Sequence, residues 1–138
     1  MSASLVSPLL VAIAVAGILA AIATPSWLSF VQQQRLSAAT DRVYQAVRTT
    51  QAEAKKTKAT QTLQPATEID SSVSVTYPTP TLSFNHRGAV ASSNMPYRIN
   101  LTVEGSRSNS HCVVVKTLLG ATSVGRNTQE CNQLETVQ

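Results

Sequence analysis

The first 34 residues of this 138-residue chain carry no charged side chain. Within them, residues 9–23 read LLVAIAVAGILAAIA, an unbroken apolar run. About 20 apolar residues suffice for a helix to cross a bilayer, and residues 5–23, with Trp27 and Leu28 as an interfacial flank, reach that length. Ala21-Ile22-Ala23 also supplies the A-x-A pattern of a signal cleavage site, but no basic residue precedes the apolar run. A secretion signal, a membrane anchor and a packing helix are therefore the three readings to distinguish.

The residues that follow Pro25 continue a helical pattern. Apolar or small side chains recur there at intervals of three and four residues, at Leu28, Val31, Leu36, Ala39, Val43, Ala46, Val47, Thr50 and Ala54. This spacing is typical of an amphipathic helix, and no glycine or proline interrupts residues 28–58. We therefore predict one helix of about fifty residues. Its first half is apolar all round, and its second half has a single apolar stripe.

From residue 61 onward the pattern changes to that of β-strands. Alternating or β-branched segments at residues 72–78, 81–85, 97–105 and 111–120 are separated by turn residues. Residues 85–88 (NHRG) predict a tight turn, residues 105–110 (GSRSNS) a loop between two hairpin strands, and residues 57–72 a connector from helix to sheet. We expect four to six short antiparallel strands that cover the helix stripe. The candidate core residues are Leu82, Phe84, Ile99, Leu101, Val113, Val115 and Leu118.

The predicted fold class is α+β, with a long N-terminal helix packed on a small antiparallel sheet. Three segments follow from it. Residues 1–27 form the hydrophobic half of the helix, residues 28–58 its amphipathic half, and residues 59–138 a globular β-sheet head.

The two cysteines, Cys112 and Cys131, are too few for a zinc site and do not form a C-x-x-C motif. In an exported chain such a pair favours one structural disulfide, which would contribute roughly 3 kcal/mol in the chain-entropy model. Two buried free thiols are the alternative.

The net charge of +4 arises entirely from one segment. Residues 35–58 hold six basic and two acidic side chains, whereas residues 59–138 hold five of each. A nucleic-acid-binding surface or a solvated helix face both fit this distribution.

Nothing in the sequence predicts an enzyme, a cofactor or a small-molecule substrate. The histidines are His86 and His111, and no G-x-S-x-G, H-E-x-x-H or phosphate-binding loop occurs. His111 beside Cys112 fits a metal or thiolate site, but also an ordinary histidine at a strand start. Glu104 and Glu130 fit a carboxylate pair, but also solubilising loop residues.

The stem GILAAIATPSWLSFVQQQRLSAATDRVYQAVRTTQAEA (residues 17–54) resembles the type IV pilins, and more narrowly the GspH/FimT group of minor pilins and pseudopilins. LSFNHRGAV (residues 82–90) is similar to that group's strand followed by a glycine turn. HCVVVKTLLGATSVGR (residues 111–126), with Cys131, is similar to its closing hairpin and cysteine pair. The resemblance implies that the stem packs in a membrane and a filament through Leu9, Leu10, Val11, Ile13, Val15, Gly17, Ile18, Leu19, Ala20, Ala21, Ile22 and Pro25.

The chain departs from the family at its N-terminus. The family motif G-F-T-L-I-E aligns with residues 3–8, so that Ala3 replaces the glycine before the peptidase cleavage point and Ser4 replaces the phenylalanine. Pro8 replaces a glutamate that in the family is thought to pair with the N-terminal amine of a neighbouring subunit. The departure puts both processing and ordinary incorporation into a filament in question.

Some members of the group bind DNA through a G-R-x-R pattern before the last cysteine. Here that position reads Gly125-Arg126-Asn127-Thr128, so the second arginine is missing. Arg126 with Lys116 would give only a weak, salt-dependent contact.

The resemblance leads us to expect a structural minor pilin or pseudopilin of a type IV pilus or a type II secretion-like filament. Its partners would be other pilin subunits and, before assembly, the bacterial inner membrane, with the head in the periplasm or outside the cell. A DNA-binding minor pilin for DNA uptake and a membrane-anchored relative that does not assemble remain alternatives.

Overall fold

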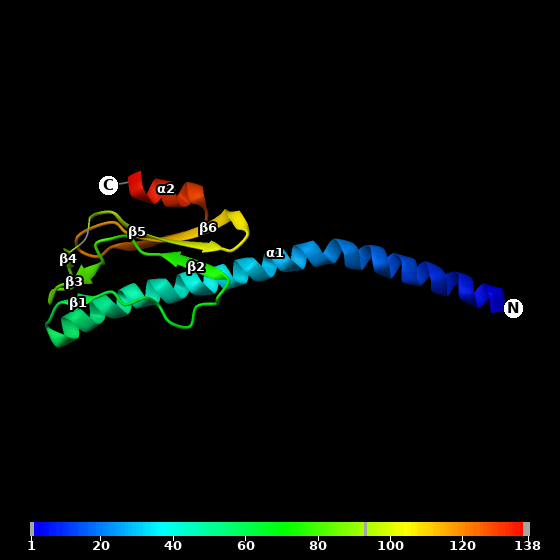
Figure 1. Ribbon diagram of the computed structural model, residues 1–138, viewed down its shortest axis with the longest axis horizontal. Coiled ribbons are helices and arrows are strands. Elements are labelled where there is room, and N and C mark those ends of the chain that lie inside the picture. Colours follow the sequence, from blue (N-terminus) through cyan, green and yellow to red (C-terminus); the bar gives the residue numbers. More distant parts are fainter. Residues whose placement is uncertain (1, 93, 137–138) are drawn as a thin grey trace. The chain divides into compact units, whose positions relative to one another are not determined.

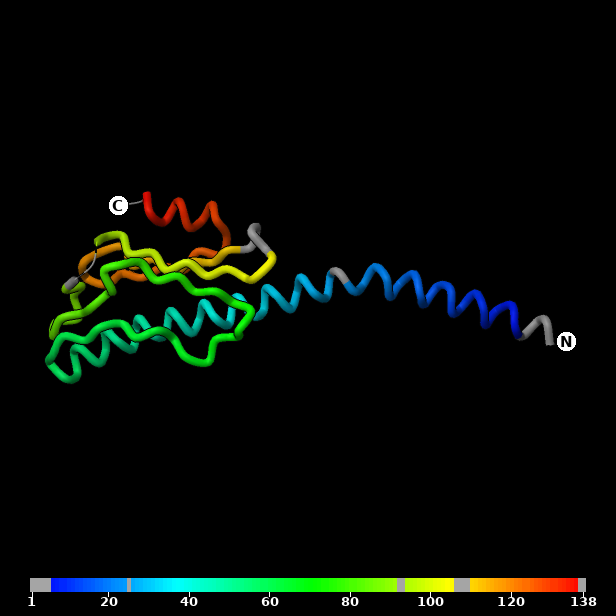
Figure 2. Tube along the Cα trace, in the orientation of Figure 1, coloured from blue at the N-terminus to red at the C-terminus, as the bar shows by residue number. Residues whose placement is uncertain are grey.

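The computed structural model describes residues 2–92 and 94–136, without the side chains of residues 2–5, 25, 92 and 106–109. The chain divides into two compact units, Met1–Gln33 and Gln34–Gln138, which are described separately below. A long N-terminal apolar helix is followed by antiparallel strands, so the α+β class is confirmed at this level. Figures 1 and 2 show the order of the elements.

The helix α1 runs from Ser2 to Thr57 and supplies all of the first unit and the first element of the second. It therefore continues through Pro8 and Pro25, as expected of one uninterrupted helix. It ends where Lys58 adopts the left-handed conformation, with φ of 53°. A residue in that conformation is a common way for a helix to terminate.

The strands form two antiparallel sheets. The smaller one has the order β1-β3-β4 and consists of Gln61–Thr62, Ser83–Phe84 and Val90–Ser92. The larger one has the order β2-β5-β6-β7 and consists of Val73–Thr76, Tyr97–Val103, Ser106–Val115 and Thr122–Gly125. The short helix α2, Thr128–Thr136, covers the face of the larger sheet opposite α1 (Figure 1).

The core lies between α1 and the inner face of the larger sheet. Strand β5 alternates strictly between buried and half-buried residues, which places every second side chain toward the helix. From α1 the core receives Leu36, Ala39, Val43, Val47 and Ala54, which are the centre of the predicted stripe. Fully burying a large aliphatic side chain stabilises the fold by about 1.5–3 kcal/mol, so this interface is the main source of stability in the second unit.

Of the predicted core residues, all but one are confirmed as completely buried: Leu82, Phe84, Ile99, Leu101, Val113 and Val115. The prediction that Leu118 belongs to the core is wrong, because 62% of this residue is exposed. Strand β6 ends at Val115, and the chain then turns, with the Lys116 amide donating to the Ala121 carbonyl at 2.8 Å. Leu118 is therefore on a turn and points away from the core. Within the stripe, Leu28 is also exposed, whereas Val31, Ala46 and Thr50 are half-buried.

Three further expectations need correction. Residues 105–110 are not a loop, because β6 begins at Ser106 and a tight turn at Glu104-Gly105, with φ of 83° at the glycine, connects it to β5. The connector at residues 57–72 contains β1, and the described residues hold seven strands in place of four to six. The helix α2 was not expected at all. The predicted turn at residues 85–88 is confirmed by a hydrogen bond from the Gly88 amide to the Asn85 carbonyl.

The contrast between two leucines of the head gives a test of this core. Leu101→Ala should lower the free energy of unfolding by about 2–5 kcal/mol, because it removes a fully buried side chain and leaves a cavity. Leu118→Ala should change it by less than about 0.5 kcal/mol, since the side chain is exposed. Denaturant unfolding in a fixed detergent, followed by circular dichroism, measures both. Equal losses would contradict this assignment of the core.

Candidate functional site

The first unit exposes a continuous apolar surface. Every described side chain between residues 6 and 30 is exposed, and twelve of the fourteen exposed large apolar side chains in the described parts of the chain lie there. Eight of the twelve predicted packing residues belong to this set. Between 49% and 67% of each is exposed at Leu9, Leu10, Val11, Ile13, Val15, Ile18, Leu19 and Ile22. Such a surface exceeds what a soluble monomer normally exposes and marks an interaction with lipid or protein.

The same surface is long enough and apolar enough to cross a membrane, judged by length and composition. Its most apolar 18-residue window has a mean hydropathy of 2.5 and no part of it is buried. The first charged residue, Arg35, comes only after the end of the first unit. The helix is therefore a candidate membrane anchor.

Small residues form a close-approach face on this helix. Gly17, Ala20 and Ala21 recur at the three- and four-residue spacing that places them on one side. All three are exposed, and a Cβ atom added at Gly17 would meet no atom within 4 Å. Another helix can therefore approach the backbone closely at this face.

The residues that depart from the pilin motif lie on α1 as well. Pro8 is exposed in the first turns of the helix. Ala3, Ser4 and Pro25 belong to the helix, but their side chains are outside the described part of the structure.

In the second unit, α1 forms two ion pairs with the connector that follows it. Arg35 Nε lies 3.6 Å from Asp70 Oδ2, and Arg42 Nη1 lies 3.1 Å from Glu68 Oε2. Two of the basic residues in the segment of excess charge are therefore paired, although such exposed pairs each contribute only about 0–1 kcal/mol. The pKa of Asp70 is lowered mainly by hydrogen bonds from the Ser72 hydroxyl and amide, and further by Arg35.

The two residues considered for DNA contact lie at opposite ends of the β6–β7 ladder. Lys116 follows Val115, which pairs with Thr122, whereas Arg126 follows Gly125, which pairs with Cys112. At 3.3 Å per residue, four to five strand positions separate them by about 15 Å. The structure therefore does not bring Lys116 and Arg126 together into one contact site.

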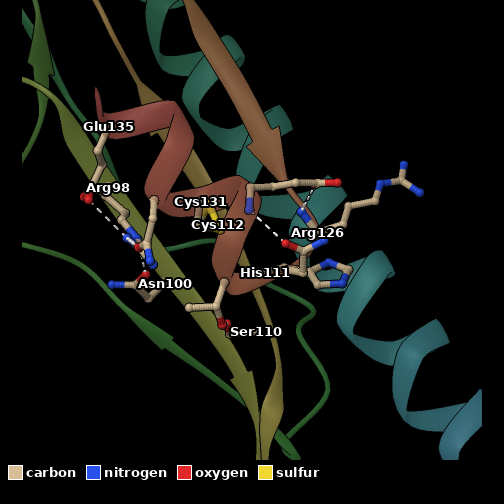
Figure 3. Close-up of a disulfide and its surroundings, with 12 residues drawn as sticks. Arg98, Asn100, Ser110, His111, Cys112, Arg126, Cys131 and Glu135 are labelled. Atoms are coloured by element: carbon tan, nitrogen blue, oxygen red, sulfur yellow. Dashed lines mark hydrogen bonds and ion pairs between the residues drawn. A yellow bond between two sulfur atoms is a disulfide. The ribbon is translucent and has the colours of Figure 1, made fainter. Parts of the chain in front are cut away.

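Cys112 on β6 and Cys131 on α2 are joined in a disulfide, and both are fully buried (Figure 3). Gly125 on β7 lies directly against it. A Cβ atom there would be 2.7 Å from Cys131 Sγ and 2.8 Å from Cys112 Sγ, so only glycine fits this position. With Val114 and Leu134 the disulfide forms a second small core between the outer sheet face and α2.

Polar contacts hold α2 at both ends. Asn127 Oδ1 accepts a hydrogen bond from the Glu130 amide at 2.8 Å, and Glu130 Oε2 accepts one from the Arg126 amide at 2.8 Å, which together cap the helix N-terminus. Near the other end, Arg98 Nη1 donates to Asn132 Oδ1 at 3.1 Å and to Glu135 Oε2 at 3.2 Å (Figure 3). These contacts and the disulfide fix α2 on the sheet.

His111 is buried where β6 meets α1. Its Nδ1 lies 3.1 Å from Thr40 Oγ1. The Thr40 hydroxyl already donates its single proton to the Leu36 carbonyl at 2.7 Å, so Nδ1 carries the proton of this contact and Thr40 accepts it. Burial lowers the pKa of His111, as does Arg126, while Glu130 and Asp41 oppose the shift. The histidine is therefore held neutral.

The geometry gives His111 a structural role in the contact between helix and sheet. Its neighbour Cys112 is bonded to Cys131 and is not a thiolate. Among the residues whose side chains are described, no three of His, Cys, Asp and Glu gather closely enough to hold a metal ion. Glu104 and Glu130 do not form a pair either. Glu104 follows β5 at its turn into β6, whereas Glu130 caps α2.

Comparison of the chain with models of protein families, with curated proteins and with solved structures found no match.

The buried His111 predicts a specific loss of stability in acid. Because its pKa is lower in the folded state, the unfolded state binds the proton first, and the free energy of unfolding should fall as pH drops below about 6.5. Asparagine keeps a hydrogen-bond donor for Thr40 but does not titrate. The variant His111→Asn should therefore remove this loss of unfolding free energy between about pH 6.5 and 5. Denaturant unfolding across that range measures the effect. His86→Asn, at an exposed site, is the control and should leave the loss unchanged; equal effects of the two variants would contradict the assignment.

Proposed function

We propose that the chain is a pilin-like structural subunit. In this proposal the apolar half of α1 anchors it in a membrane and then packs among similar helices in a filament, while residues 34–138 form the displayed head. Its partners are other subunits of the same kind, and it has no catalytic role.

One observation carries the proposal: a single helix has two different environments. The described side chains of residues 6–30 of α1 are all exposed and uncharged, whereas the stripe from Leu36 to Ala54 is buried under the strands of the head. A helix that is apolar all round requires lipid or other helices as its surroundings. The same helix therefore connects an insertion segment to a folded domain.

The exposed face of the helix supports packing against other helices. Helices in lipid associate through close backbone approach at small residues, and Gly17, Ala20 and Ala21 supply such a face. No charged residue interrupts the segment, so no cost of a buried charge opposes insertion.

The head supports an exported location. Its buried disulfide between Cys112 and Cys131 is typical of oxidising compartments outside the cytosol. The resemblance of residues 17–54 and of the closing hairpin to the GspH/FimT group favours a minor pilin or pseudopilin. The subunit would thus begin in the inner membrane with its head in the periplasm and move from there into a pilus or pseudopilus.

A charge placed in the exposed apolar half tests the anchor. Ile18→Lys should lower membrane insertion about 100-fold, because a lysine at the centre of a spanning helix costs roughly 3 kcal/mol. The matched control Ser74→Lys adds the same charge to an exposed strand position of the head and should have no effect. The measurement is the fraction of full-length chain that resists carbonate extraction from membranes. Equal extraction of both variants would refute the anchor.

Pro8 separates a filament subunit from an anchored relative that does not assemble. A glutamate at this position can pair with a neighbouring N-terminal amine inside apolar surroundings, whereas proline cannot. If the chain is a non-assembling anchor, Pro8→Glu should raise its share in sheared filaments, with its membrane level unchanged. If the wild-type chain already enters filaments, the change should have little effect. Pro8→Gln, which carries no charge, is the control.

A further inference from the structure

The end of the head at which α1 terminates carries a cluster of basic side chains from three segments. We define this basic tip as Lys55, Lys56 and Lys58 at the end of α1, Arg87 in the turn before β4, and Lys116 in the turn between β6 and β7. Four of them are exposed and Lys116 is half-buried. None of the five forms an ion pair among the residues that the structure describes.

Hydrogen bonds join the three segments into one rigid surface. Gln51 Nε2 on α1 donates to the Gly88 carbonyl at 2.8 Å and to the Leu119 carbonyl at 3.2 Å. The Val90 amide donates to the Leu118 carbonyl at 2.7 Å. The side chain of Lys55 lies across Gly88 so closely that a Cβ atom at this glycine would clash with it. The segments that carry the basic tip are therefore held together at one end of the head.

The acidic residues of the head lie mostly at its other end. Glu68 and Asp70 pair with Arg42 and Arg35 near the start of the second unit. Glu104 follows Val103 at one end of β5. Tyr97 lies at the other end of β5 and pairs with Val115, the residue before Lys116. Glu53 faces the groove between α1 and residues 61–67. Glu53 lies one helical turn before Lys56, and Glu135 pairs with Arg98 near the same end of the sheet. The five basic side chains outnumber these two acidic ones, so the basic tip keeps a net positive charge.

Two exposed leucines lie in the turn between β6 and β7, next to Lys116. Leu118 and Leu119 are 62% and 82% exposed, and they are the large apolar side chains exposed outside residues 6–30 in the described structure. Their turn is fixed by the bond from the Lys116 amide to Ala121, and by one from the Gly120 amide to the Thr117 carbonyl at 2.9 Å. A pre-ordered apolar pair loses little conformational freedom on binding.

We propose that the basic tip, with Leu118 and Leu119, binds the surface of an anionic lipid membrane. Lysine and arginine side chains interact with anionic headgroups, and the two leucines enter the boundary between headgroups and acyl chains. A nucleic acid would bind the basic side chains alone, because its phosphates make no favourable contact with exposed leucines. The combination of charge with an apolar wedge favours lipid. The head of the subunit would thereby adhere to a membrane surface.

The test uses the full-length chain in nanodiscs of neutral phosphatidylcholine, to which separate vesicles are added. Capture of vesicles that contain phosphatidylglycerol is measured by flotation and compared with capture of pure phosphatidylcholine vesicles. We expect strong capture of the anionic vesicles only, and a loss of capture as salt is raised. Failure of the chain to enter nanodiscs would contradict the proposed membrane anchor. The same comparison is then made on beads that hold the chain by its N-terminus.

Two double variants of equal charge change make the test specific. Arg87→Gln with Lys116→Gln removes two charges of the basic tip and should lower capture about 25-fold, because each basic residue near an anionic surface contributes about fivefold. Arg48→Gln with Arg126→Gln removes two exposed charges elsewhere and should lower it far less. Leu118→Ser with Leu119→Ser should weaken capture while leaving its salt dependence unchanged.

Three results would overturn the proposal. The first is equal capture of neutral and anionic vesicles, and the second is an equal loss in the two charge variants. The third is binding of a short DNA duplex that depends on Arg87 and Lys116 while anionic vesicles are not captured, which would assign the basic tip to nucleic acid.

Discussion

The burial of the α1 stripe under the strands is the interaction on which the rest of the head depends. The strands are only two to ten residues long, and short strands of this kind are not stable without a partner layer. Leu36, Val43 and Val47 are completely or almost completely buried and supply that layer. The helix in turn needs the strands, because its stripe would otherwise face water. Helix and sheet therefore fold as one unit from residue 34 onward.

Much of this architecture follows from patterns that a single sequence contains. The three- and four-residue spacing of Leu36, Ala39, Val43 and Val47 identified the buried face, and the alternation in residues 97–103 identified β5. Leu118 was misplaced because it continues the apolar run of β6, and the run itself does not reveal that the strand ends at Val115. What ends it is the turn around Gly120, whose φ is 88°. Residues 105–110 are polar and predict a loop, yet β6 begins at Ser106. Ser106 pairs with Val103 and Ser110 with Thr102, and the register shifts between these two pairs.

The candidate surfaces were predictable to different degrees. The exposed apolar half of α1 is visible from composition alone, because no other segment lacks charge over such a length. The helix α2 was missed although Asn127 and Glu130, three residues apart, are a recognisable capping signal. The basic tip could not be predicted, because its charges come from residues far apart in sequence that tertiary contacts, among them those of Gln51, bring together. Lys116 and Arg126 are close in sequence but lie apart, because they stand at opposite ends of the β6–β7 ladder.

The disulfide has a consequence for how the head responds to proteases. Cys112 and Cys131 enclose β7 and the two exposed turns on either side of it, which contain Lys116 and Arg126. A single cut after either residue leaves both fragments covalently linked through the sulfur atoms. On a denaturing gel, a chain cut once in this region would therefore separate into two fragments only after the disulfide is reduced. The segment carrying α2 would stay attached to the body even with its backbone severed.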